Sequence, residues 1–235
     1  LQTGIEALTC MTHRGGIAAD GKTGDGCGLL IQKPDSFLRE IVKTELSSTL
    51  DEQYGIGSLM LPRDLNKAQT AKRILLEELT KEGLNDVLWR EVPVNNECLG
   101  PIALDSEPYF VHMFVNAGSL DDQQTNAKLF FVRRRVELRL AEERDFYIAS
   151  LSATVMSFKG LMMPVDLPQY YLDLADPRLE TAICVFHQRF STNTLPRWPL
   201  AQPFRMIAHN GEINTIMGNR NWSEARTNKF ISELL

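Results

Sequence analysis

The chain has 235 residues, of which 43% are hydrophobic, which is enough for one domain with its own core. A formal net charge of −5 and the lack of a long basic run argue against a nucleic-acid-binding protein. No apolar stretch has the ~20 residues of a membrane-spanning helix. The four cysteines form no C-x-x-C pair, so we expect a reduced, cytoplasmic protein. From the charge and the lack of a long apolar stretch, we expect it to bind neither nucleic acid nor membrane.

Hydrophobic periodicity predicts helices and strands that are grouped in blocks rather than alternating strictly. Helices are predicted over residues 2–13, 35–45, 64–82 and 129–140. Strands are predicted over residues 29–32, 54–61, 87–94, 109–116, 183–186 and 206–208, with a hairpin formed by 147–151 and 154–158, and a loop over 160–171. This arrangement favours a single α+β domain over residues 1–235.

The segment 20–28 is rich in glycine, with Gly24, Gly26 and Gly28 at alternate positions. The spacing is not that of a dinucleotide-binding loop, and the glycines precede a strand instead of opening a helix. We therefore expect close backbone packing here, with Asp20 and Asp25 as turn residues.

The segment 183–220 carries the strongest functional signal, because two short apolar runs each end in polar groups. Arg189 follows the first run, and a guanidinium can donate two parallel hydrogen bonds to a carboxylate. Asn210 and Gly211 follow the second run, and an amide NH2 and a backbone N–H can converge on an oxyanion. From the residues alone, Arg189 is also compatible with a structural ion pair, and the spacing of Asn210–Gly211 by itself favours a hairpin turn.

Five segments together resemble a known family. They are His209–Asn214, His187–Thr194, Met11–Gly16, Ala19–Gly28 and Tyr170–Leu174. Their order and spacing resemble the glutaminase domain of glutamate synthase, most closely that of the large chain of the bacterial NADPH-dependent enzyme. This domain is a class II glutamine amidotransferase of the N-terminal-nucleophile hydrolases, and the resemblance covers essentially the whole chain.

The resemblance implies a four-layer α-β-β-α sandwich of two mainly antiparallel sheets, truncated at both ends. It implies hydrolysis of L-glutamine to glutamate and ammonia, which is used for the amination of 2-oxoglutarate. By position, it implies that Arg189, Thr192 and Asn193 bind the substrate and that Asn210, Gly211 and Arg14 belong to the catalytic machinery.

The nucleophile of the family is a cysteine at the mature amino terminus, whose α-amino group is the base. The printed chain begins at Leu1, and we expect none of its four cysteines to replace this residue. The printed chain by itself is therefore predicted to be inactive.

For the whole enzyme the resemblance implies FMN, an iron–sulfur cluster and NADPH, with none of them held by this chain. It implies L-glutamine, the remaining synthase domains and the small subunit as partners, with Arg197–Trp198 and the loop 160–170 as candidate contact surfaces. The alternatives are a non-catalytic glutamine-binding module and a purely structural domain of a larger enzyme.

Overall fold

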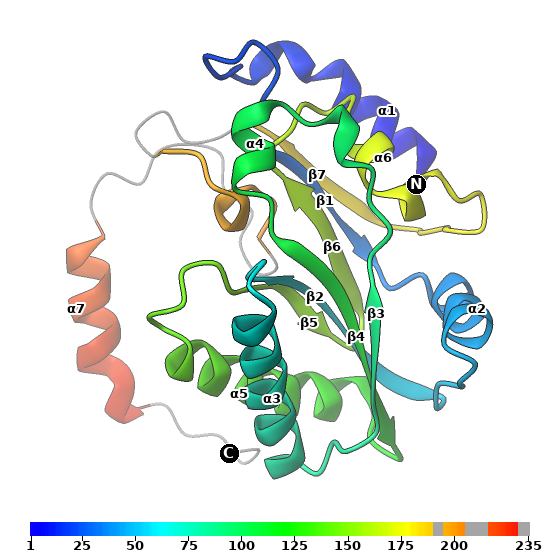
Figure 1. The fold of residues 1–235 in the computed structure, drawn as a ribbon. Coiled ribbons are helices and arrows are strands. Elements are labelled where there is room, and N and C mark those ends of the chain that lie inside the picture. Colours follow the sequence, from blue (N-terminus) through cyan, green and yellow to red (C-terminus); the bar gives the residue numbers. More distant parts are fainter. Residues whose placement is uncertain (190–194, 205–215, 230–235) are drawn as a thin grey trace.

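Two antiparallel sheets form the centre of the computed structural model, which describes residues 1–189, 195–204 and 216–229 (Figure 1). The first sheet has the strand order β6-β1-β7, and the second has the order β3-β4-β2-β5. The strands are β1 (Cys27–Gln32), β2 (Gln53–Leu61), β3 (Val87–Glu91), β4 (Tyr109–Gly118), β5 (Tyr147–Ser152), β6 (Val155–Gly160) and β7 (Cys184–Gln188). Every pairing between them is antiparallel, which confirms the predicted α+β class.

Helices α1, α3 and α5 cover the outer faces of the two sheets. In Figure 1, α1 lies along the three-stranded sheet, while α3 and α5 lie against the four-stranded sheet on the opposite side of the molecule. The α-helices are α1 (Gln2–Cys10), α2 (Asp35–Glu45), α3 (Leu65–Lys81), α4 (Pro101–Asp105), α5 (Asp122–Arg139), α6 (Leu167–Tyr170) and α7 (Met217–Arg226). The order of layers is therefore α-β-β-α, as the family resemblance implied.

Strand β4 shows how alternation builds these layers. Phe110 and Phe114 belong to the hydrophobic cluster between the sheets and under α1 and α2. Val111, Met113 and Val115 belong to a second cluster with the apolar faces of α3 and α5. Because successive side chains of a strand point to opposite faces, a continuous apolar run buries both faces of the sheet.

Side-chain caps start the two long helices, and α5 begins at Asp122, seven residues before the predicted start at residue 129. The Asp64 carboxylate accepts hydrogen bonds from the backbone N–H groups of Asn66 and Lys67 at 2.9 and 3.1 Å, which starts α3. Asp121 and Gln124 form a capping box at the start of α5. None of the described helices combines the length and the apolar character that crossing a membrane requires.

The predicted hairpin of residues 147–151 and 154–158 is wrong. Strand β5 pairs with β2 in one sheet, whereas β6 pairs with β1 in the other. The Asn126 side chain of α5 accepts hydrogen bonds from Ser152 Oγ at 2.8 Å and from the N–H of Ala153 at 3.0 Å. These contacts hold the short link between the strands against α5, so the chain crosses from one sheet to the other.

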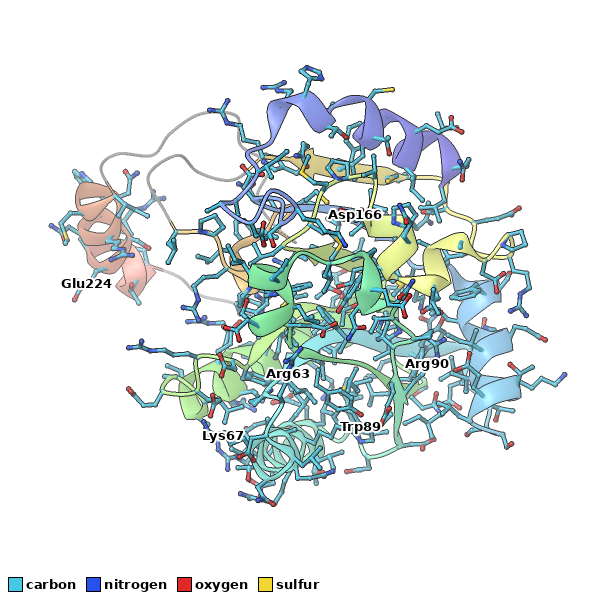
Figure 2. The ribbon with its side chains drawn as sticks, turned by 45° about the horizontal axis from the view of Figure 1, so that its top comes forward. Arg63, Lys67, Trp89, Arg90, Asp166 and Glu224 are labelled. Atoms are coloured by element: carbon cyan, nitrogen blue, oxygen red, sulfur yellow. The ribbon has the colours of Figure 1, made fainter. Side chains whose placement is uncertain are left out.

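A partly buried ion cluster joins β3 to two distant segments. The Arg90 guanidinium donates to both carboxylate oxygens of Asp173 at 2.6 and 2.9 Å, and to those of Glu45 at 2.7 and 3.0 Å. Figure 2 shows Arg90 on the side of the sheet next to α2, whose last residue is Glu45. Burial alone would lower the pKa of Arg90, but the hydrogen bonds to Asp173 and Glu45 raise it, so the guanidinium stays charged.

The glycine-rich loop packs against backbone, as its composition predicts. A methyl group on Gly24 would lie 2.4 Å from the carbonyl carbon of Met162 and 2.6 Å from the nitrogen of Met163. We expect Gly24→Ala to lower the free energy of unfolding by about 1–3 kcal/mol, because two backbone segments must separate. Urea denaturation of the protein measures this change.

Gly218→Ala is the matched control, because a methyl group at this position in α7 would meet no atom of the described residues within 4 Å. Alanine is the better helix former, so this variant should be as stable as the wild type or more stable. Equal destabilisation by both variants would contradict the packing explanation for Gly24.

Candidate functional site

Two segments distant in sequence meet at the carboxyl end of β7. Gln188 is paired with Cys27 at the start of β1, and the backbone N–H of Arg189 donates to the carbonyl of Gly26 at 3.4 Å. The turn that carries Arg14 lies at the same place, because Gly15 contacts the Gln188 side chain. The structure therefore brings together the segments of two predicted site residues, Arg14 and Arg189.

Gly15 has no space for a side chain. A methyl group on it would lie 1.9 Å from Gln188 Nε2 and 3.1 Å from Asp25 Oδ1. Gln188 is only 3% exposed, and neither polar atom of its carboxamide has a hydrogen-bond partner among the described residues. Gln188 was missed in the sequence analysis, although its place between His187 and Arg189 in a conspicuous motif was a usable signal.

Arg189 has an unusual backbone conformation, with φ at 111°, in a region that residues other than glycine rarely adopt. His187 Nε2 donates to the carbonyl of Arg189 at 2.8 Å and supports this conformation. Strained backbone of this kind is concentrated at functional sites.

The two arginines remain available for an anion. Arg14 ends a short 3-10 helix, Thr12–Arg14, and its side chain is exposed, as is that of Arg189. Within the described part of the chain, neither guanidinium forms an ion pair. The other predicted site residues, Thr192, Asn193, Asn210 and Gly211, lie outside the described residues, as does the predicted strand 206–208.

The glycine-rich loop beside the site is anchored by Asp20. Its carboxylate accepts from the N–H groups of Lys22 and Thr23 at 3.0 and 2.8 Å, as expected for a turn residue. The Asp20 carboxylate also accepts hydrogen bonds from the Thr23 hydroxyl and from the N–H of Ile102 in α4. These hydrogen bonds, chiefly that from the Thr23 hydroxyl, hold the pKa of the Asp20 carboxyl below its usual range. The loop is thereby fixed to α4.

Three of the cysteine thiols are poor candidates for a nucleophile. Burial raises the pKa of Cys27, with Asp166 and Asp25 adding to the effect, and burial also raises the pKa of Cys98 and Cys184. Raising the pKa lowers the fraction of reactive thiolate at neutral pH. Cys27 is the first residue of β1.

The connector, residues 195–204, lies against the edge of the site. Trp198, in the 3-10 helix Trp198–Leu200, is only 2% exposed, and its Nε1 donates to the carbonyl of Ala103 at 3.1 Å. The expected contact surface at Arg197–Trp198 is therefore wrong for Trp198, although Arg197 is exposed. The predicted loop 160–170 contains α6, and its residues Leu161 and Met162 are buried.

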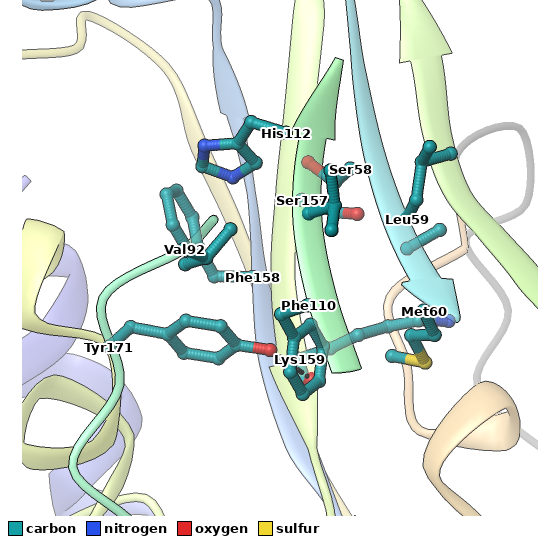
Figure 3. Close-up of a pocket in the computed structure, with 12 residues that line it drawn as sticks. Ser58, Leu59, Met60, Val92, Phe110, His112, Ser157, Phe158, Lys159 and Tyr171 are labelled. Carbon is teal, nitrogen blue, oxygen red and sulfur yellow. Dashed lines mark hydrogen bonds between the residues drawn. The ribbon is translucent and has the colours of Figure 1, made fainter. Parts of the chain in front are cut away.

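An enclosed cavity between the sheets is a separate feature (Figure 3). It is lined by His112, Ser58 and Ser157, among others, and its volume of about 10 Å³ matches a single water molecule, so glutamine cannot bind there. Burial, with a smaller contribution from Arg90, lowers the pKa of His112 to about 3. His112 is therefore neutral near pH 7, and the cavity includes none of the predicted site residues.

Residues 1–235 match the sequence profile of a family described as glutamine amidotransferases class-II. The chain is 42% identical over 234 residues to the glutamate synthase (NADPH) large chain of Azospirillum brasilense, covering 98% of this chain and 15% of that protein. It is 38% identical over 236 residues to the Bacillus subtilis glutamate synthase (NADPH) large chain, covering 99% of this chain and 16% of that protein. It is 40% identical over 225 residues to ferredoxin-dependent glutamate synthase 1 of Arabidopsis thaliana, covering 94% of this chain and 14% of that protein. The chain thus spans a small part of the length of these relatives.

Proposed function

The chain belongs to the class II glutamine amidotransferases, and from this premise we propose that it is the glutaminase part of a glutamate synthase. It hydrolyses L-glutamine to L-glutamate and ammonia, and the ammonia is used to aminate 2-oxoglutarate elsewhere in the enzyme. The names of the relatives, which include both NADPH and ferredoxin-dependent synthases, support this assignment.

The contact between the Arg14 turn and the end of β7 is the observation that carries the proposal. Gly15 lies against Gln188, and Arg189 is bonded to Gly26 through its backbone. Two exposed guanidiniums without ion pairs among the described residues therefore come from segments in contact. This arrangement supports a site that takes an anionic substrate.

Each residue of the proposed site has a distinct role. Arg189 binds the α-carboxylate of glutamine, because its planar fork matches the two oxygens. Thr192 and Asn193 shape the same loop. Asn210 and the N–H of Gly211 donate to the oxyanion that forms on the side-chain amide, and Arg14 steadies the nucleophile.

The proposed reaction proceeds through a thioester. A cysteine thiolate adds to the side-chain amide carbon, the C–N bond breaks, and the nitrogen leaves as ammonia after taking up a proton. Water then hydrolyses the thioester, which releases glutamate and the thiol. In this class the nucleophile is an amino-terminal cysteine, and the raised pKa values of Cys27, Cys98 and Cys184 make these thiols unsuitable substitutes.

We place FMN, the iron–sulfur cluster and NADPH with the remaining synthase domains and the small subunit. An iron–sulfur cluster is held by converging cysteine thiolates. In residues 1–189, 195–204 and 216–229, no three His, Cys, Asp or Glu side chains converge in this way. The cysteines are free thiols, which supports a reducing, cytoplasmic setting.

Arg189→Ala tests the proposed substrate contact. We expect the KM for L-glutamine to rise about 10- to 100-fold, because hydrogen bonds to a charged group are lost. Arg189→Lys should recover only part of the loss, since an ammonium cannot form the paired bonds. Steady-state ammonia release by the full-length protein measures both effects.

The α-amide of L-glutamine, which lacks the carboxylate, makes this test specific. The wild type should prefer L-glutamine to this amide, and Arg189→Ala should lose most of that preference. Arg144→Ala is the control, because Arg144 is also exposed and forms no ion pair in the described part of the chain. A preference that survives in Arg189→Ala would contradict the role of Arg189, and wild-type protein that releases no ammonia would contradict the proposed function.

A further inference from the structure

We propose that Lys159 is a positioning residue, whose buried side chain holds the connector in place and so supports the proposed glutaminase site. Lys159 is in β6 and is only 1% exposed. Its Nζ donates to the carbonyls of Pro199 and Ala201 at 3.0 and 2.8 Å. The effect on catalysis rests on the proposed function, whereas the effect on the connector does not.

Aromatic rings complete the surroundings of the Lys159 Nζ. It lies 4.6 Å from the ring centroid of Tyr147 in β5 and 4.7 Å from that of Phe204 in the connector. Figure 3 shows the Lys159 side chain directed toward Met60, away from the ring of Tyr171. Lys159 forms no ion pair within the described residues, so carbonyl oxygens and ring faces are the groups that stabilise its charge.

Burying an amino group without a carboxylate is unfavourable. Burial, with a smaller contribution from Arg133, lowers the pKa of Lys159 to about 7. An apolar side chain of similar length would fill the same space without this cost. The advantage of lysine here is its N–H groups, which join β6 to two carbonyls of the connector.

The connector fits closely against the strands beneath it. A methyl group on Gly28 would lie 2.7 Å from the carbonyl oxygen of Gln202, and one on Gly160 would lie 2.3 Å from Cζ3 of Trp198. A methyl group on Gly26 would lie 3.2 Å from Cβ of Ala201. The glycines allow this close approach, and Lys159 supplies the directional bonds.

The connector matters because of its place in the chain. It follows the segment of Arg189, Thr192 and Asn193, and it precedes Asn210 and Gly211. A displacement of Pro199 and Ala201 would therefore change the path of the chain between the carboxylate-binding and the oxyanion-binding residues. Small displacements of this kind strongly affect the chemical step.

Lys159→Met in the full-length protein tests the proposal. Hydrogen exchange followed by mass spectrometry should show about 10- to 100-fold faster exchange in the peptide that contains Leu200 and Ala201, whose N–H groups are bonded within the connector. The kcat for glutamine should fall about tenfold or more, with the KM within about threefold of the wild type.

Lys33→Met is the matched control. Lys33 also donates to a backbone carbonyl, that of Tyr54 at 3.2 Å, and lies 3.9 Å from the Tyr54 ring centroid, but it does not contact the connector. It should change neither the exchange of the connector nor the kcat. Phe204→Leu is a milder second variant, which removes one ring from Lys159 and should shift both measurements in the same direction by a smaller factor.

Unchanged exchange of the connector in both Lys159→Met and Phe204→Leu would overturn the proposal. Faster exchange with a wild-type kcat would overturn the link to catalysis. If Lys159→Met does not fold, Phe204→Leu decides the question. If the wild type does not hydrolyse glutamine, the proposed function fails, and the exchange measurement still tests whether Lys159 holds the connector.

Discussion

Asp173→Ala should lower the free energy of unfolding by about 3–5 kcal/mol, because it leaves the buried charge of Arg90 without its main partner. The side chains of Arg90 and Asp173 are 3% and 5% exposed, and two hydrogen bonds of 2.6 and 2.9 Å join them. Glu45, the second partner of Arg90, is 45% exposed and cannot compensate fully. Urea denaturation of the variant measures the loss.

A double replacement separates the charge from the packing. Arg90→Met together with Asp173→Leu removes both charges, and it should be markedly more stable than Asp173→Ala. Asp176→Ala is the control, because its partner Arg178 is exposed and the pair is screened by solvent. A loss in Asp173→Ala no larger than in Asp176→Ala would show that the buried pair is not the cause.

The segment Tyr170–Leu174, which is part of the family resemblance, has a structural role that includes the Arg90–Asp173 pair. The Tyr170 hydroxyl donates to Glu107 Oε1 at 2.6 Å, and the Tyr171 hydroxyl donates to the carbonyl of Lys159 at 2.8 Å. With Asp173 bonded to Arg90, three polar groups of one short segment are tied to three other parts of the chain. The segment stabilises the packing near the site and need not touch a substrate.

Asn210→Ala should lower the kcat for glutamine hydrolysis by about 10²–10³, which corresponds to about 2.7–4 kcal/mol of barrier. The amide NH2 of Asn210 is proposed to bind the oxyanion, a group that exists only during the reaction. The KM should therefore change little, in contrast to the effect of Arg189→Ala. Ammonia release at saturating and at low glutamine separates the two constants.

Asn219→Ala is the control for this variant, because Asn219 is exposed on α7. It should have wild-type kcat and KM. A kcat of Asn210→Ala within about threefold of the wild type would assign Asn210–Gly211 to the turn that their sequence also allows. An increase in the KM alone would indicate a binding role instead.

Many of the helices and strands could be predicted from the sequence, because hydrophobic periodicity and capping residues are local signals. Helix α2 has the predicted bounds, and α3 begins after the cap at Asp64. Strands β2 and β4 are long apolar runs, and their burial on both faces follows from their composition. Arg189 could be identified as a candidate site residue because it directly follows an apolar run, which is also a local signal.

Pairings between distant residues could not be predicted from those signals. Periodicity identified β5 and β6 as strands, but it does not say which partner each one chooses, so the hairpin was wrongly predicted. Lys159 reads as one lysine in an apolar strand, and only its contacts with Pro199 and Ala201 explain its burial.

The sequence by itself determined the kinds of elements, the glycine-rich packing and the family resemblance, since each depends on residues close together in the chain. The tertiary structure decided that the Arg14 turn meets the end of β7, that Arg90 pairs with Asp173, and that Lys159 supports the connector. These contacts join residues far apart in the chain, and their energy arises only when folding removes the intervening water.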